Sequence, residues 1–155
     1  MAKRSAGFLL YRRRQGGLEV FLVHPGGPFW VRKDEGAWSI PKGECAEGEE
    51  PLAAARREVA EETGVTVAGD FLALGEVRQA GGKRVTAWAV EMDLDPAVVR
   101  SNTFSMEWPP RSGKLSEFPE VDRADWFPIA VARTRLLGSQ VAFVDRLLHE
   151  LGMRE

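Results

Sequence analysis

The hydrophobic positions of the chain fall mostly in short runs separated by glycine- and proline-rich turns. Residues 5–11 and 18–24 are apolar and are joined by a Gln15-Gly16-Gly17 turn, which is typical of two strands in a hairpin-like connection. Pro25-Gly26-Gly27-Pro28 then predicts a loop. Further strands are predicted over residues 65–68, 71–79, 84–92 and 124–127, with Gly81-Gly82 turning the second of these into the third.

A different spacing predicts a helix in the first half of the chain. Pro51 suits the first helical position, and Leu52, Ala55 and Val59 recur on one helical face. Gly64 is placed to end this helix as a C-terminal cap.

The second half of the chain is predicted to be less regular. Residues 95–108 read as irregular with one helical turn, and 109–114 as a loop. A helix opens over 129–135, is interrupted near Gly138-Ser139, and is followed by an amphipathic helix over 141–151. Strands that alternate with a few helices indicate an α/β fold, a mixed sheet flanked by helices.

Composition limits the classes of protein. The length of 155 residues suits a single domain over 1–155, and a net charge of −2 argues against a stable nucleic-acid partner. The Arg12-Arg13-Arg14 triplet is therefore interpreted as a solvated strand end. The lone Cys45 cannot form an internal disulfide, and no apolar segment resembles a signal peptide or membrane span, so a cytoplasmic protein without a membrane partner is expected.

Residues 44–62 hold seven glutamates among 19 residues. Their number alone favours a solvated acidic segment, but their placement points to chemistry. Glu58, Glu61 and Glu62 share an arc of roughly 100° on the predicted helix. Because Mg²⁺ and Mn²⁺ prefer carboxylate oxygens, this arc is a candidate site for a cation that neutralises a diphosphate.

The segment 43–65 resembles the complete Nudix box. Gly43 is followed by five residues and Glu49, and seven residues later come Arg57-Glu58-Val59, Ala60, Glu61-Glu62, Thr63, Gly64 and Val65. All nine constrained positions match without a gap. The chain therefore resembles the Nudix hydrolases.

This resemblance implies an α/β/α sandwich with a mixed sheet and a loop–helix–loop catalytic motif. It implies that Glu58, Glu61 and Glu62 bind Mg²⁺ or Mn²⁺, often with the backbone carbonyl at the position of Gly43. Arg57, placed with the catalytic glutamates, would pair with Glu49, while Glu49 and Gly64 would be structural. The implied reaction is hydrolysis of a phosphoanhydride bond in a nucleoside diphosphate linked to another group.

A general base or further metal ligand is expected outside the box. Glu120 is the first candidate, because its position six residues before Trp126 resembles the downstream glutamate of dinucleoside polyphosphate hydrolases. Glu117 and Glu107 are the alternatives.

The residues that contact substrate are predicted less sharply. The run from Trp38 to Gly43 resembles the entrance to the box in diadenosine polyphosphate hydrolases and some enzymes that cleave nucleoside triphosphates, with Lys42 contacting phosphate. Trp30 and Trp108 lie in loop-like segments suited to stacking on a base. Phe104 and Phe118 are comparable candidates for stacking on the base, and His24, Lys33, Lys83 and Arg84 are weaker candidates for contacting phosphate.

The expected substrate is a nucleotide, with diadenosine polyphosphates as the first choice. Modified nucleoside triphosphates, ADP-ribose, nucleotide sugars and capped RNA remain alternatives, as does a regulatory Nudix domain that binds nucleotide without cleaving it. The oligomeric state, monomer or homodimer, is left open by the sequence.

Overall fold

One long strand organises the sheet of this protein, whose computed structural model describes residues 3–153. Strand β1 (Arg4–Arg14) pairs in parallel with β5 and antiparallel with β2 and β3, which meet different halves of it. Within the described residues the main sheet has six strands in the order β4-β5-β1-β2-β8, with β3 beside β1. The partner strands are β2 (Gly17–Pro25), β3 (Lys42–Glu44), β4 (Leu72–Arg78), β5 (Arg84–Glu91) and β8 (Val121–Pro128).

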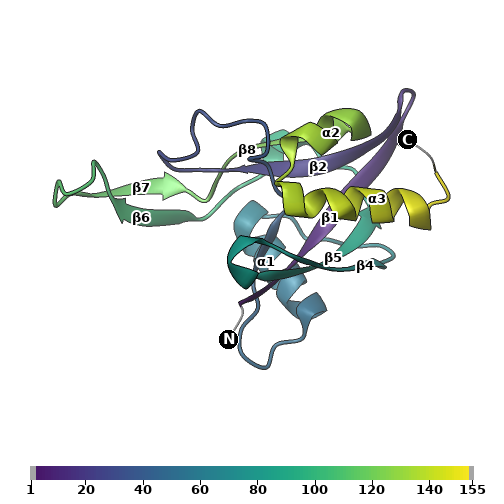
Figure 1. Cartoon of the computed structure of the whole chain (residues 1–155), viewed down its shortest axis with the longest axis horizontal. Coiled ribbons are helices and arrows are strands. Elements are labelled where there is room, and N and C mark those ends of the chain that lie inside the picture. The colour runs from purple at the N-terminus through teal and green to yellow at the C-terminus, as the bar shows by residue number, and fades with distance from the viewer. Residues whose placement is uncertain (1–2, 154–155) are drawn as a thin grey trace.

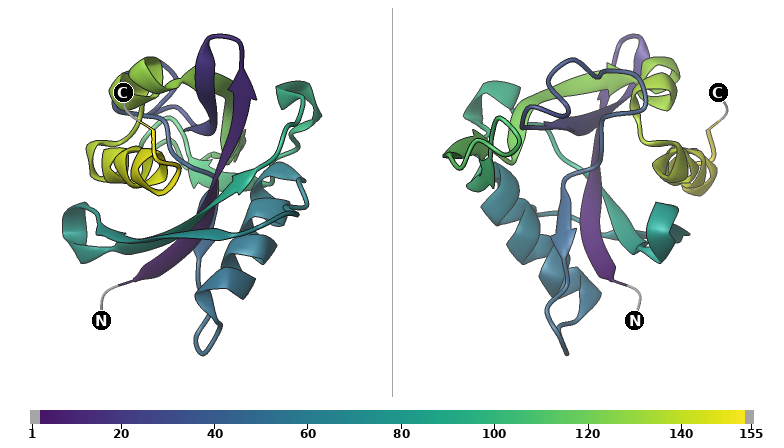
Figure 2. Two further views of the ribbon diagram at one scale, coloured as in Figure 1. Left: turned by 90° about the vertical axis from the view of Figure 1, so that its right-hand side faces the viewer. Right: turned by 60° about the vertical axis from the view of Figure 1, so that its left-hand side comes forward.

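Helices cover both faces of this mixed sheet, so the predicted α/β architecture is confirmed (Figure 2). Strand β1 alternates between the two faces: Phe8 and Leu10 pack in the core on the side of α1, and Leu9 and Tyr11 in the core on the side of α3. The helices are α1 (Pro51–Thr63), α2 (Ile129–Arg135) and α3 (Val141–Glu150), with short 3-10 turns η1 (Ala80–Gly82), η2 (Pro96–Val98) and η3 (Gly138–Gln140).

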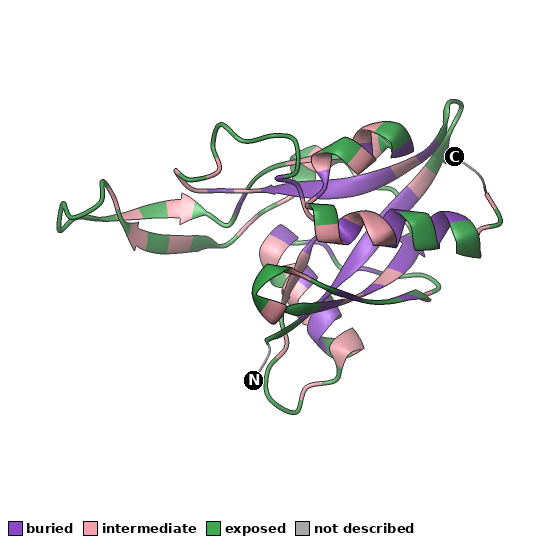
Figure 3. Cartoon of the chain, in the orientation of Figure 1, coloured by how far each residue is buried: buried purple, intermediate pink, exposed green. Residues whose placement is uncertain are grey.

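Burial concentrates on β1, β2 and the inner faces of the helices (Figure 3). Each large apolar side chain removed from water there contributes about 1.5–3 kcal/mol to folding before entropic costs. Among residues 3–153, none of the helices combines the length and apolar character needed to cross a bilayer.

A two-stranded arm projects from the main sheet (Figure 1). It consists of β6 (Thr103–Glu107) and β7 (Leu115–Pro119), joined by the predicted 109–114 loop. The prediction that residues 95–108 are irregular is therefore wrong for 103–107. Both arm strands alternate between exposed and half-buried positions, and this weak pattern becomes a sheet only because the two strands pair with each other.

The predicted strand over residues 65–68 is wrong, although its alternating pattern is real. Val65 and Val67 are buried while Thr66 and Ala68 are exposed, but within residues 3–153 the segment has no strand beside it to complete a hydrogen-bonded ladder. Strand β8 also begins at Val121 rather than at the predicted Ala124.

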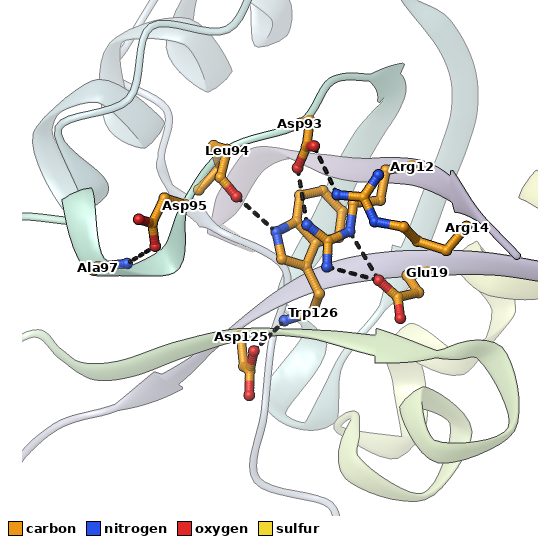
Figure 4. Close-up of polar contacts among 9 residues, drawn as sticks. All are labelled: Arg12, Arg14, Glu19, Asp93, Leu94, Asp95, Ala97, Asp125 and Trp126. Atoms are coloured by element: carbon orange, nitrogen blue, oxygen red, sulfur yellow. Dashed lines mark hydrogen bonds and ion pairs between the residues drawn. The ribbon is translucent and has the colours of Figure 1, made fainter. Parts of the chain in front are cut away.

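The arginine triplet lies at the end of β1 and is matched by acidic side chains (Figure 4). Arg12 bonds to Glu19 and Asp93 and stacks over Trp126 at 4.3 Å from the ring centroid. Arg14 bonds to Asp93 at 2.7 Å, and these two arginines hold the pKa of Asp93 down at about 2. The charge of the triplet is thus largely matched by neighbouring carboxylates.

Candidate active site

Local signals place helix α1 and the loop before it. Glu50 is in extended conformation immediately before Pro51, and Gly64 adopts the left-handed conformation at φ 76° while its N–H donates to the carbonyl of Ala60. The apolar side of the helix, which includes Ala55 and Val59, packs into the core. The glutamate side is left beside β3 and β1, where the helix makes its contacts with the sheet.

Gly43 and Glu58 are in direct contact across this boundary. A Cβ atom built on Gly43 would lie 2.1 Å from the Glu58 Oε2 atom, well inside any allowed separation. The Glu58 carboxylate therefore occupies the space that a side chain at position 43 would need. This contact fixes the carboxylate against the backbone of β3.

Arg57 gathers the acidic groups of the loop and helix. Its guanidinium donates to both carboxylate oxygens of Glu49, at 3.0 and 2.8 Å, and to Glu58 at 2.7 Å and Glu61 at 3.3 Å. A bidentate fork of this kind sets geometry as well as charge. The guanidinium is the main reason why the pKa of Glu49 is lowered to about 2, helped by the Ala46 N–H.

Glu62 and Lys42 lie together, one from α1 and one from β3. The backbone N–H of Lys42 approaches the Glu62 Oε1 atom at 3.4 Å. Burial raises the pKa of Glu62 to about 8, against the lowering effect of Lys42, and the charges of Glu120 and Glu58 raise it further. Burial likewise lowers the pKa of the Lys42 ammonium, and Lys83 adds to that effect.

Glu120, which immediately precedes β8, faces the same acidic region from the other side. Partial desolvation raises its pKa, and the negative charges of Glu58 and Glu61 raise it further. A carboxylate 57 residues from the end of the box helix is thus brought beside it by the pairing of β8 with β2. The alternatives Glu107 and Glu117 lie on the arm strands instead.

A cleft of about 200 Å³ opens between these groups. Lys42, Glu62 and Glu120 supply its charged wall, while the remaining wall is apolar or aromatic apart from Ser39 and includes Trp30. Larger hollows on the described surface lie away from these carboxylates, so the chemistry rather than the size of the cleft identifies it. The other lining residues were not predicted as substrate contacts, because no local sequence signal distinguishes them. They are Val23, Pro25, Ala37, Ser39, Val121 and Leu137.

Two predicted substrate contacts are buried instead. His24 has no exposed surface, and both of its ring nitrogens are engaged inside the protein, so direct contact with phosphate is contradicted. Trp38 is 4% exposed, donates its indole N–H to Asp34 and packs edge-on against Phe127, which makes it a core residue. Trp38 was predicted from the resemblance of the Trp38–Gly43 run and His24 from its place at a strand end, and neither signal reveals how deeply a side chain is packed.

The remaining predicted contacts lie on the rim or beyond it. Lys83 is exposed just before β5, and Arg84 is exposed as the first residue of β5, 3.8 Å from Glu76. Trp108 lies past the end of β6, and its ring packs edge-on against Phe29 with centroids 5.4 Å apart. Of the predicted aromatic contacts, Trp30 is the one that lines the cleft.

The chemistry of the donor set fits a divalent cation. Burial is the main cause of the raised pKa values of Glu62 and Glu120. The negative charges of Glu120 and Glu58 add to the shift of Glu62, those of Glu58 and Glu61 add to the shift of Glu120, and a cation would relieve this repulsion. Among residues 3–153, no three histidine, cysteine or acidic side chains are gathered closely enough to hold a metal ion as they stand. Glu58 and Glu61 turn toward Arg57, so binding requires them to turn toward the cation.

The fold and this motif define the class of protein: the chain belongs to the NUDIX family, whose domain model matches residues 1–149. It is 33% identical over 146 residues to an 8-oxo-(d)GTP phosphatase of Mycolicibacterium smegmatis, covering 86% of this chain and 37% of that protein. It is 50% identical over 52 residues to an RNA pyrophosphohydrolase of Caulobacter vibrioides, covering 30% of each. The chain thus spans about a third of the length of these relatives.

Solved structures share the fold over nearly the whole chain. A C. elegans Ap4A hydrolase binary complex superposes with a TM-score of 0.66 at 20% identity, covering 97% of this chain and 98% of that one. The NUDIX domain of Shewanella oneidensis NrtR, complexed with ADP ribose, gives 0.68 at 19% identity, covering 97% and 89%. At such identity these likenesses establish the fold alone.

Proposed function

We propose that this chain hydrolyses a phosphoanhydride bond in a nucleoside diphosphate-linked substrate with the help of Mg²⁺ or Mn²⁺. The observation that carries the proposal is the convergence of Glu62 of α1 with Glu120 and Lys42 at one cleft, with Glu58 and Glu61 near enough to raise the pKa of Glu120. Like charges are costly to hold together without a cation or a protonated partner. A phosphate chain brings its cations with it, so substrate and site complement each other.

The residues divide into distinct roles. Glu58, Glu61 and Glu62 would hold the cation, with the carbonyl of Gly43 as a further ligand, and when bound it neutralises phosphate charge and acidifies water. Arg57 holds Glu58 and Glu49 in place through its fork. Glu120, with its raised pKa, is suited to take the proton from the attacking water.

Lys42 and the apolar wall would bind the substrate. The Lys42 side chain lines the cleft beside Glu62 and carries the positive charge nearest to an entering phosphate. Trp30 presents an aromatic surface to the same cleft, which suits stacking of a base. Trp38 is buried, so its ring does not contact the substrate directly. The resemblance of the run from Trp38 to Gly43 therefore supports a diadenosine polyphosphate substrate only through its other residues.

Two substrate classes therefore merit direct comparison. Diadenosine polyphosphates are favoured by the spacing of Glu120 and Trp126. Modified nucleoside triphosphates are favoured by the 33% identity to a protein named 8-oxo-(d)GTP phosphatase. Both reactions use the same carboxylates and differ only in what occupies the cleft beyond the phosphates.

The test is turnover of a substrate panel with and without Mg²⁺. The panel contains diadenosine tetraphosphate, 8-oxo-dGTP, ADP-ribose, a nucleotide sugar and a 5′-triphosphorylated RNA. We expect metal-dependent cleavage that falls by about a hundredfold or more in Glu62→Gln and in Glu61→Gln, since each removes a charge at the site. Release of ATP plus AMP would identify diadenosine tetraphosphate as the substrate. Release of 8-oxo-dGMP with pyrophosphate, or of 8-oxo-dGDP with phosphate, would identify the triphosphate and show which of its phosphoanhydride bonds is cut.

Two results would contradict the proposal. Unchanged turnover in both glutamine variants would reject the assigned carboxylates. Nucleotide binding without any metal-dependent product would favour a regulatory domain. Glu47→Gln, which removes an exposed carboxylate of the loop before α1, is the control and is expected to leave turnover unchanged.

A further inference from the structure

His24 lies buried beneath the cleft and is bonded to two different segments. Its Nδ1 atom is 2.7 Å from the Asp122 Oδ1 atom, and its Nε2 atom is 2.6 Å from the backbone carbonyl oxygen of Lys33. The ring has no exposed surface and packs edge-on against Trp38. Because a carbonyl oxygen only accepts, the Nε2–H group donates to Lys33, while Nδ1 bonds to Asp122.

The first partner, Asp122, is the extra residue of a β-bulge. His24 pairs with Arg123 and Pro25 pairs with Val121, so Asp122 has no opposite residue on β2. Bulges of this kind re-aim neighbouring side chains, often next to active sites. Glu120 lies two residues before the bulge, and its carbonyl accepts the Gly26 N–H at 3.0 Å. The bond from His24 thus holds the bulge beside the candidate general base.

The second partner, Lys33, closes the turn that carries Trp30. The Lys33 N–H donates to the Trp30 carbonyl at 2.9 Å, and the Trp30 N–H donates to Gly27 at 3.2 Å. Over residues 28–36 the backbone forms turns without strand pairing, and most of these residues are exposed. The bond from the buried His24 ring therefore restrains a turn that has few other interactions to hold it. The Trp30 side chain of this turn lines the cleft.

We propose that His24 is a positioning residue that sets Trp30 and Glu120, which both line the cleft, relative to each other. One imidazole reaches the loop wall through Lys33 and the β8 wall through Asp122. These two bonds of His24 form a bridge between the segments. Loss of both bonds would disturb substrate binding and proton transfer, whereas loss of the Asp122 bond alone would act mainly on Glu120. This inference rests on the proposed function for its kinetic readout.

The two halves of the bridge can be separated by substitution. Asp122→Ala removes the bond to the bulge and leaves the bond to Lys33, so we expect kcat to fall by about tenfold to a hundredfold while KM changes little. Asp122→Asn keeps an acceptor oxygen and should recover most of that loss. His24→Phe keeps the ring volume but removes both bonds, so we expect the same fall in kcat together with a rise of about tenfold in KM.

Controls separate positioning from general destabilisation. His149→Phe alters the chain's other histidine, on α3 and away from the cleft, and should leave both constants unchanged. If His24 only stabilised the fold, its substitution would lower the thermal midpoint and the folded fraction. It would leave the KM of the enzyme that remains folded at its original value. If His24→Phe does not fold, the contrast between Asp122→Ala and Asp122→Asn still tests the bridge through kcat.

Amide hydrogen exchange supplies a readout that needs no turnover. Exchange at the Trp30 and Lys33 amides should become faster in His24→Phe and stay unchanged in Asp122→Ala, because the Lys33 bond survives there. Failure of the proposed function would appear as no turnover in the unaltered protein, with this exchange pattern intact. Unaltered exchange and unaltered KM in a folded His24→Phe would overturn the positioning role.

Discussion

A Cβ atom on Gly43 would lie 2.1 Å from the Glu58 carboxylate, so the backbone of β3 and the box helix α1 meet at a point where no side chain fits. The geometry of the candidate cation site depends on this contact. The glycine is needed here for space, since its φ is not in the left-handed region.

Gly43→Ala should therefore displace Glu58 and weaken catalysis. A shift of about 1 Å in a positioned group costs on the order of a hundredfold in rate, so we expect kcat/KM to fall by about that factor. The measurement is metal-dependent turnover of the best substrate in the panel. Gly16→Ala is the matched control, because a Cβ atom there meets nothing within 4 Å. Equal activity of the two variants would show that the Gly43–Glu58 contact is unimportant.

Replacing Arg57 with lysine should disrupt the acidic cluster while keeping the positive charge. A lysine cannot form the fork that holds both oxygens of Glu49 and also reaches Glu58. We expect a fall of about tenfold or more in kcat/KM and weaker Mg²⁺ binding by calorimetry. The neighbouring Arg56→Lys is the control, since Arg56 stacks over Phe71 on another side of α1. An equal effect of both substitutions would contradict a specific role for the fork.

Trp30→Ala should weaken nucleotide binding more than it slows chemistry. Stacking of a base on an aromatic ring is worth about 1–3 kcal/mol, which corresponds to a KM increase of roughly tenfold. Trp108→Ala provides the comparison. The Trp108 ring, just past the end of β6, packs on Phe29 and does not line the cleft. A larger rise in KM for Trp108→Ala than for Trp30→Ala would move the base site to the arm.

The ion pairs of Asp93 should make stability depend on pH in the acid range. The pKa of Asp93 is lowered from 3.8 to about 2 by hydrogen bonds from Arg14 and Arg12, so the unfolded chain binds more protons between those values. Its stabilising contribution is present above pH 3.8 and is lost as the pH falls through 2.

Urea unfolding tests this pH dependence. We expect Asp93→Asn to be less stable than the unaltered protein at about pH 5, and the difference to shrink toward about pH 2. The effect should be modest and should weaken with salt, because the Asp93 side chain is 54% exposed. Asp70→Asn, which removes an exposed carboxylate that has no ion pair within residues 3–153, should show no such convergence.

The box and its helix could be predicted because their signals are local. Helix spacing, Pro51 and Gly64 define α1 within one stretch of chain, and the predicted bounds agree with the observed 51–63. The pairing of Arg57 with Glu49 also spans only eight residues. Such features depend on backbone periodicity and turn chemistry, which a single segment specifies.

The arm and the 65–68 segment were predicted wrongly because strand formation depends on a partner. Residues 65–68 have the pattern of a half-buried strand but no neighbour, whereas Thr103–Glu107 have a weak pattern and find one in β7. The sequence also gave no sign that His24 is enclosed on both ring nitrogens. Burial and pairing of this kind are set by segments distant in the chain.

By itself, the sequence determined the acidic helix, its capping glycine and the arginine that orders it, since these follow from spacing over one or two turns. Only the tertiary structure decided that Glu120 joins the box glutamates, that Trp30 lines the cleft, and that Trp38 and His24 are buried. The reason is physical. These placements follow from pairing β8 with β2, strands about 100 residues apart, and no local pattern encodes which distant surfaces a folded chain brings together.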